Sequence, residues 1–194
     1  YGHLLDIAAR TYPGFEIVAV ADDNPEGLKR AAARLRVERT YLDYRRLLEE
    51  QRPEIVVIGP RWADCHLEMA LAAAEAGASI LMDKPMARTV AECDRIIEAC
   101  DRARVKLVVA HNMRVCPILD VVEQKVREGF IGELLELRGR GKEDRRAGGE
   151  DLMVLGTHVF DLMRRFAGDP AWAQGWVTVE GREVTRADAR EGGE

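Results

Sequence analysis

The feature that most constrains the fold is a set of short apolar runs that end abruptly at polar residues or breakers. Ile55 to Ile58 is apolar throughout and stops at Gly59-Pro60, and Ile80 to Met82 stops at Asp83-Lys84-Pro85. Strands that are apolar without alternation are typical of parallel sheets covered by helices on both faces. We therefore expect these runs to be neighbouring parallel strands in a buried sheet.

Helical patterns separate the apolar runs. Residues 25–35, 44–50, 63–76 and 89–104 have the spacing or capping residues of helices, whereas 15–21 and 106–110 are expected to be further strands. This alternation predicts an α/β fold with a doubly wound parallel sheet of the Rossmann type. In the helix from 89 to 104, the residues expected on the buried face are Val90, Cys93, Ile96, Ile97 and Cys100.

The pattern changes after Arg114. A helix is expected at 117–128, a strand at 132–140, a helix at 150–166 and a strand at 172–179. Two strands and two helices cannot readily close a sheet-based core. We therefore interpret residues 1–114 as a nucleotide-binding domain and residues 115–194 as part of a second, α+β domain.

Charge and composition exclude several classes of protein. The 29 basic and 34 acidic residues give a net charge of -5 and are interspersed, so nucleic acid is not expected as a partner. No apolar run approaches the roughly 20 residues that cross a bilayer, so no membrane insertion is expected. The four cysteines have neither metal-binding nor disulfide-scaffold spacing. Reduced thiols indicate a cytoplasmic protein, unless an export signal precedes Tyr1.

Lys84 is the first candidate for chemistry. Ligands of open α/β sheets bind beyond the carboxyl ends of the strands, where Lys84 lies; the alternative is an ordinary lysine in an exposed loop. His158, on the later helix, is the second candidate, with Asp161 three residues further on and therefore a neighbour on the helix surface. The alternative for His158 is a histidine satisfied in the interface between domains. A lysine and a histidine from separate elements could meet at one substrate.

Together these residues resemble the Gfo/Idh/MocA family of NAD(P)-dependent oxidoreductases, two-domain enzymes that act largely on sugars, polyols and related compounds. The most specific pieces are Asp83-Lys84-Pro85, where the family usually has Glu-Lys-Pro, and the GGxxLxxxGxHxxD run from Gly148 to Asp161. Further positions that fit the family pattern are Pro60, His66, Arg114 and Pro117. The resemblance extends from His3 to about Gly168.

The resemblance implies NAD as the cofactor. Family members begin with a strand and a GxGxxG loop that holds the pyrophosphate, and neither is present in the sequence. The chain therefore resembles a fragment without that strand and most of the second domain, expected to fold poorly and to be inactive alone. Asp22 falls where an acid binds the adenosine ribose, and Asp23 adds charge that disfavours the 2′-phosphate of NADP. The alternative is that Asp22 and Asp23 only cap a turn.

Further cofactor contacts are implied around the strand ends. Packing or capping is the alternative for His66, and an exposed loop is the alternative for Arg61 and Trp62. A cis peptide before Pro85 is possible from the sequence. The positions implied as cofactor contacts, besides Asp22 and Asp23, are Pro60, Arg61, Trp62, His66, Asp83, Lys84, Pro85, Asn112 and Arg114. The neighbouring His111 also ends a strand.

Roles in catalysis follow from the chemistry of alcohol oxidation. Hydride transfer requires a group that accepts the hydroxyl proton, and an imidazole with an ordinary pKa of about 6.5 can do so at neutral pH. We assign this role to His158 and a polarising role to Lys84. Asp161 either orients His158 or pairs with Arg165. Many family dehydrogenases carry an Asp at the position of Val154, which this chain lacks.

The leading hypothesis is a dehydrogenase that transfers a hydride between NAD(P) and a sugar, polyol or related small molecule. The complete protein is expected to be a homo-oligomer, because the open sheet of the family's second domain often mediates dimers or tetramers. A sensor that keeps the fold without turnover is the alternative, and Val154 favours it. A third reading is a lyase or hydrolase that uses NAD transiently.

Overall fold

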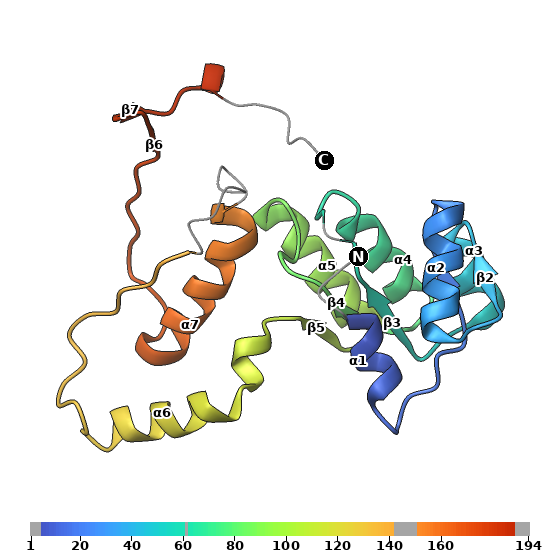
Figure 1. Cartoon of the computed structure of the whole chain (residues 1–194), viewed down its shortest axis with the longest axis horizontal. Helices are drawn as coiled ribbons and strands as arrows, with labels where there is room; N and C mark the ends of the chain where they lie inside the picture. The colour runs from blue at the N-terminus through green and yellow to red at the C-terminus, as the bar shows by residue number, and fades with distance from the viewer. Residues whose placement is uncertain (1–4, 61, 142–150, 189–194) are drawn as a thin grey trace.

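The computed structural model describes residues 5–60, 62–141 and 151–188 (Figure 1). Parallel strands alternate with helices through the first part of the chain, so the α/β fold expected from the sequence is confirmed. In chain order the elements are α1 (Leu5–Thr11), β1 (Val20–Ala21), α2 (Pro25–Leu35), β2 (Thr40–Tyr41), α3 (Tyr44–Gln51), β3 (Ile55–Ile58), α4 (His66–Glu75), β4 (Ser79–Met82), α5 (Val90–Ala103), β5 (Leu107–Val109), the 3-10 turn η1 (Asn112–Val115), α6 (Pro117–Arg127), the π-helical turn η2 (Asp151–Gly156), α7 (Thr157–Ala167), β6 (Thr178–Val179), β7 (Arg182–Glu183) and the 3-10 turn η3 (Arg186–Asp188).

The parallel strands form two separate groups. Strands β3, β4 and β5 make one sheet, in which Ile58 pairs with Met82 and Met82 pairs with Val109. Strands β1 and β2 pair only with each other among the described residues. A cleft of about 2200 Å³ lies between the groups and is lined by residues 17–22 and 55–58. The doubly wound order has its central strand at this position, and the described residues supply none there.

The core lies where α4 and α5 pack side by side on the three-stranded sheet (Figure 1). Ala70 and Ala73 of α4 are fully buried, and these small side chains let α4 approach the sheet closely. Ile96 of α5 is also fully buried. The expectation for Val90 and Ile97 was wrong: they are 78% and 46% exposed, because they share a line on α5 about 100° from Ile96.

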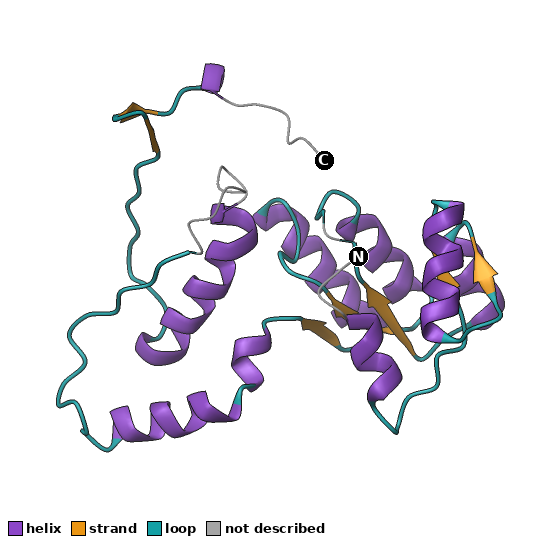
Figure 2. Ribbon diagram, in the orientation of Figure 1, coloured by secondary structure: helices purple, strands orange, loops and turns teal. Residues whose placement is uncertain are grey.

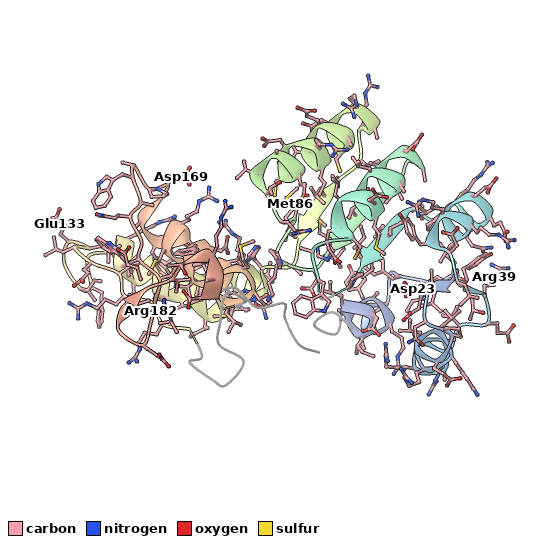
Figure 3. All side chains as sticks on the ribbon, turned by 90° about the horizontal axis from the view of Figure 1, so that it is seen from above. Asp23, Arg39, Met86, Glu133, Asp169 and Arg182 are labelled. Atoms are coloured by element: carbon pink, nitrogen blue, oxygen red, sulfur yellow. The ribbon has the colours of Figure 1, made fainter. Side chains whose placement is uncertain are left out.

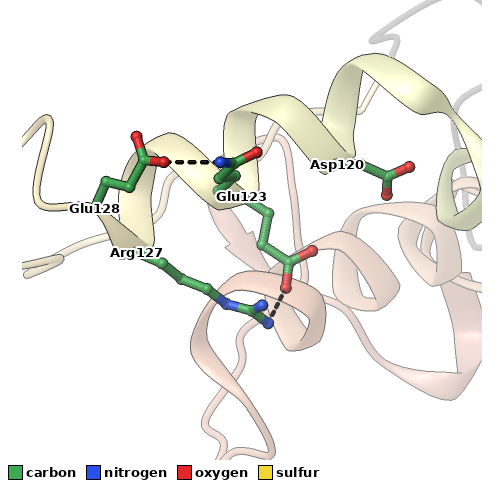
Figure 4. Close-up of a pocket in the computed structure, with 5 residues that line it drawn as sticks. Asp120, Glu123, Arg127 and Glu128 are labelled. Carbon is green, nitrogen blue, oxygen red and sulfur yellow. Dashed lines mark hydrogen bonds and ion pairs between the residues drawn. The ribbon is translucent and has the colours of Figure 1, made fainter.

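The second part of the chain contacts the first through α7 and lies to one side of it. Seen from above, Glu133, Asp169 and Arg182 belong to one group of elements and Asp23, Arg39 and Met86 to the other (Figure 3). No residue of α6 is buried. A pocket of about 370 Å³ on α6 is lined by acidic and basic side chains (Figure 4).

Arg165 joins α7 to α6 and η1. Its Nε donates to Glu123 Oε2 at 2.9 Å, its Nη2 contacts Asp120, and its Nη1 donates to the Arg114 carbonyl at 3.1 Å. The Arg165 side chain is only 10% exposed, and Asp120 and Glu123 point from α6 toward α7 (Figure 4). Arg165 therefore holds the segment after β5 against α7.

Three expected strands are shorter than the sequence suggests or absent. Residues 132–140 form a loop, the strand expected at 172–179 is reduced to Thr178–Val179, and that expected at 15–21 is reduced to Val20–Ala21 (Figure 2). A strand requires a hydrogen-bonding partner, and the described residues provide few. Gly139 instead packs so closely on Val159 of α7 that a Cβ atom there would clash.

The helix expected at 150–166 is in fact two different helical segments. The turn η2 is π-helical and precedes α7. Because a π turn closes from residue i to i+5, it advances fewer degrees per residue than an α-helix, so a stripe drawn at α-helical spacing fails there. Leu152, which α-helical spacing would align with the apolar Leu155 and Val159, is 55% exposed.

Two general properties of the described part of the chain bear on its class. No helix in residues 5–188, gaps at 61 and 142–150 aside, has the length and hydropathy that crossing a membrane requires. All four cysteines carry free thiols.

The division of the sheet predicts unequal amide protection. The amides of Val20 and Asp22 donate to β2 at the edge of the cleft, whereas those of Asp83 and Ala110 join strands that helices cover. Hydrogen exchange on this 194-residue chain should be at least 10-fold faster for Val20 and Asp22, because a two-residue ladder beside a cleft opens locally. Equal protection of the two pairs would contradict this.

Candidate active site

The turn after β4 buries two ionisable side chains. Asp83 is fully buried and Lys84 is 1% exposed, so the reading of Lys84 as an exposed loop lysine is wrong. The Lys84 amide donates to Asp83 Oδ1 at 2.8 Å, and the Lys84-Pro85 peptide bond is cis. A buried ammonium requires polar partners. Lys84 Nζ donates to the Val154 carbonyl oxygen at 2.6 Å.

The carbonyl that accepts from Lys84 belongs to the π-helical turn η2. π-helical turns inside helices are found frequently at functional sites. Val154 lies four residues before His158, so the bond from Lys84 attaches the end of β4 to the start of the helix that carries His158. Lys84 and His158 therefore both lie at the contact between the first part of the chain and the segment formed by η2 and α7.

His158 meets a second imidazole, that of His111. The two ring centroids are 5.6 Å apart and the ring planes are at 78°, an edge-to-face arrangement. Burial lowers the pKa of His111; Asp161 opposes this shift, while Arg114 and Lys84 add to it. His111 is therefore a neutral imidazole at pH 7. Sequence reasoning noted His111 as a strand end but did not place it beside His158.

Asp161 pairs with Arg114, not with Arg165. Arg114 Nε donates to Asp161 Oδ1 at 2.6 Å, and the Asp161 side chain is 12% exposed. The guanidinium of Arg165 is directed to α6 instead. Of the two alternatives considered for Asp161, the pair with Arg165 was wrong, because residues at a helical spacing of four compete with partners from other elements. The sequence gives no local signal for a partner 47 residues away.

Several buried polar atoms in this region have no hydrogen-bond partner among the described residues. They include His111 Nδ1, Thr157 Oγ1 and Asp161 Oδ2. Buried polar atoms are nearly always hydrogen-bonded in folded proteins, so such a group requires an explanation. Thr157 was missed by sequence reasoning, and its position next to His158 was the one available signal.

Four of the cofactor residues inferred from the sequence line the cleft between β1 and β3. Its lining includes Asp22, Asp23, Pro60 and Trp62, all at or just beyond the carboxyl ends of the two strands. Arg61 lies outside the described residues. In open α/β sheets ligands bind at this edge, beyond the carboxyl ends of the strands, whereas the body of the cleft is the position of the central strand.

Asp22 lies in the turn before α2 and also lines the cleft, so both roles considered for it fit its position. Its Oδ1 accepts the Asn24 amide at 2.9 Å, so it does cap the turn into α2. A Cβ atom on Gly27 would lie 2.7 Å from Asp22 Oδ2, so the carboxylate fits only because residue 27 is a glycine. Asp23 is exposed. One carboxylate oxygen of Asp22 is fixed and the other lies against the start of α2.

His66 is buried between the loop after β3 and the turn after β4 and contacts both. The ring is fully buried, with Nδ1 2.9 Å from the Pro85 carbonyl oxygen and Nε2 2.9 Å from that of Pro60. This environment matches the packing role considered for it. His66 thus sets the separation between the end of β3 and the turn that carries Lys84. Asn112 and Arg114, in η1, are exposed residues next to His111.

The described residues contain no group of three or more His, Cys, Asp and Glu side chains that could hold a metal ion. The chemistry available at the site is therefore that of one ammonium, two imidazoles and one ion-paired carboxylate. Such a set can bind hydroxyl groups and accept a proton from one of them.

Comparison with known proteins gives consistent matches. A family model described as the GFO_IDH_MocA oxidoreductase family, NAD-binding Rossmann fold, matches residues 3–111. D-Apiose dehydrogenase of Paraburkholderia graminis is 33% identical over 172 residues, which are 84% of this chain and 46% of that enzyme. Levoglucosan dehydrogenase of Pseudarthrobacter phenanthrenivorans is 31% identical over 166 residues, which are 77% of this chain and 42% of the enzyme.

A solved structure of levoglucosan dehydrogenase in complex with NADH and levoglucosan is also similar. The TM-score is 0.68 at 29% identity, and the match covers 78% of this chain and 45% of that one. The chain thus spans about half the length of the relatives that it matches.

The position of His66 predicts a large effect on stability. His66→Ala should lower the free energy of unfolding by roughly 2–4 kcal/mol, because a buried cavity forms and two carbonyl oxygens lose their contacts. His66→Phe, which keeps the ring volume, should recover only part of this loss. Chemical denaturation measures both changes, and wild-type stability of the Phe variant would show that the carbonyl contacts contribute nothing.

Proposed function

Because the chain belongs to the Gfo/Idh/MocA family of oxidoreductases, we propose that it supplies the cofactor cleft and the proton-transfer residues of an NAD-dependent dehydrogenase. The proposed substrate is a sugar, polyol or related hydroxylated small molecule, as in the similar dehydrogenases. The observation that carries the proposal is the meeting of Lys84, His111 and His158 beyond the ends of β4 and β5. Residues 1–114 form the cofactor domain and 115–194 part of the substrate domain.

The cofactor residues in this proposal are those of the cleft. Asp22 binds the adenosine ribose through Oδ2, the carboxylate oxygen that the turn does not use, while Oδ1 holds the turn. Asp23 is exposed beside it and repels an additional phosphate, which favours NAD over NADP. NAD, when bound, accepts a hydride from the substrate carbon.

The protein residues handle the hydroxyl group. His158 accepts the hydroxyl proton, and the Lys84 ammonium stabilises the negative charge that develops on the oxygen. Burial of Lys84 strengthens this interaction, because the effective dielectric constant around a buried charge is lower than in water. The Arg114–Asp161 pair fixes the helix face on which His158 lies.

A non-catalytic sensor of dinucleotide or sugar is the second candidate. The observation that favours it is the main-chain carbonyl of Val154 beside Lys84, in a turn where many dehydrogenases of the family place an Asp. A sensor would bind the same ligands without net electron transfer.

An assay separates the two candidates. The full-length protein that contains this chain, incubated with NAD and, in turn, levoglucosan, D-apiose and myo-inositol, should form NADH, measured by its absorbance, with at least one of them. Calorimetric binding of these compounds without NADH formation would favour the sensor. Product formation without NADH would indicate transient use of NAD.

Substitutions at the two central residues should abolish most turnover. Lys84→Ala and His158→Asn should each lower kcat by at least about 100-fold, because each removes a group that acts on the reacting oxygen. Lys125→Ala is the matched control, since Lys125 is an exposed lysine paired with Glu128 on α6. Near-normal kcat in either active-site variant would contradict the assigned roles.

A substitution at Gly27 tests whether Asp22 binds NAD without changing the residues assigned to proton transfer. Gly27→Ala should weaken NAD binding by roughly 10-fold or more, because the new Cβ displaces the Asp22 carboxylate that binds the ribose. Glu26→Ala, an exposed neighbour on the same helix, should leave the Kd for NAD unchanged. Fluorescence titration measures both, and tighter binding of NADP than NAD by the wild-type protein would overturn the choice of cofactor.

A further inference from the structure

His111 and Lys84 occupy equivalent places on neighbouring strands. Met82 of β4 pairs with Val109 of β5, and Lys84 and His111 each follow these partners by two residues. Both side chains therefore leave the sheet at the same level of its carboxyl edge. His111 comes from the sheet and His158 from α7, so the edge-to-face pair lies where the two halves of the chain meet.

Unpartnered polar atoms belong to this pair or to residues next to it in the chain or in charge contact with it. His111 Nδ1 has no hydrogen-bond partner among the described residues, and neither has Asp161 Oδ2, although both atoms are buried. Thr157 Oγ1, next to His158 in the chain, is in the same state. These atoms come from two elements that are far apart in the sequence, which would be unusual for an incidental packing defect. A ligand with several hydroxyl groups would satisfy them together.

The ionisation of His111 suits a hydroxyl partner. The charged and titratable groups around it are Lys84, Arg114, Asp161 and His158, and burial together with the two cations keeps it neutral. A neutral imidazole has one donor and one acceptor nitrogen, and a hydroxyl group both donates and accepts. A neutral ring also avoids repulsion with the nearby Lys84 ammonium.

We propose that His111 is a specificity-determining residue that hydrogen-bonds, through Nδ1, a substrate hydroxyl on a carbon next to the one that is oxidised. His158 acts on the reacting hydroxyl, and Asp161 Oδ2 and Thr157 Oγ1 are further partners for the neighbouring one. The proposal rests on the proposed function and deepens it: the enzyme requires a vicinal diol and not merely an alcohol.

The test compares a substrate with its own deoxy analogues. The compound among levoglucosan, D-apiose and myo-inositol with the highest kcat/KM is assayed beside its monodeoxy analogues, with wild-type protein and the variants His111→Phe and His111→Asn. Phe keeps a ring against His158 but no nitrogen, and Asn keeps a polar group without the ring. Sites that bind a substrate hydroxyl reject analogues without it by large factors, on the order of 10⁴.

The wild-type protein should prefer the parent compound over one deoxy analogue by at least about 100-fold. His111→Phe should lower kcat/KM for the parent but change it less than about 3-fold for that analogue, so the preference collapses, and His111→Asn should restore part of it. An equal fall for parent and analogue in the Phe variant would show that His111 only packs, and no change for either would overturn the proposal as well.

Calorimetry separates this proposal from the proposed function. All three compounds and their monodeoxy analogues are titrated into wild-type and His111→Phe protein, so that the measurement does not depend on turnover. Hydroxyl-dependent binding that the Phe variant loses, in a protein that forms no NADH, would support the His111 contact while contradicting the dehydrogenase. Binding of parent and deoxy compounds with equal affinity would contradict the His111 contact whether or not NADH forms.

Discussion

The burial of the Lys84 ammonium is the constraint on which the arrangement of the site depends. A charged amine that is 1% exposed must have polar partners, and one of them is the Val154 carbonyl, 70 residues away in the chain. Any arrangement that moved α7 away from the end of β4 would break this bond and leave a buried charge with one partner fewer. The same bond therefore joins the two halves of the chain and sets the place of His158. Arg165 and the Arg114–Asp161 pair also hold α7 against the first part of the chain, through the segment that follows β5.

The sheet provides the other half of the geometry. The loops that follow neighbouring parallel strands lie at the same edge of the sheet. Lys84 and His111, which follow the paired residues Met82 and Val109, therefore lie at the same edge although no local sequence pattern links them. The same edge continues across the cleft to Asp22 and Pro60. His66 fixes the spacing of two of these loops through their carbonyl groups. The residues at the mouth of the cleft and Lys84 with His111 are thus two parts of one edge, and the buried core under α4 and α5 supports the part that carries Lys84.

The sequence predicts those features that depend on local chemistry. The alternation of elements and the position of Lys84 after a buried strand follow from apolar runs and the breakers that end them, which act over a few residues. Long-range partners could not be predicted in the same way. The pairing of Asp161 with Arg114 and the contact of His111 with His158 depend on how α7 docks, which no local pattern encodes. The strand expected at 132–140 failed for the related reason that strand formation depends on a neighbour.

The absence of a carboxylate at position 154 weighs less against catalysis than the sequence alone suggests. A carboxylate beside Lys84 would neutralise the ammonium and compete with a substrate oxygen for it. A carbonyl stabilises the ammonium by its dipole and adds no negative charge that would oppose an oxygen becoming negative during reaction. The π-helical turn directs this carbonyl at Lys84 without help from the side chain of Val154. In this chain a main-chain carbonyl therefore positions Lys84, where a carboxylate side chain would otherwise do so.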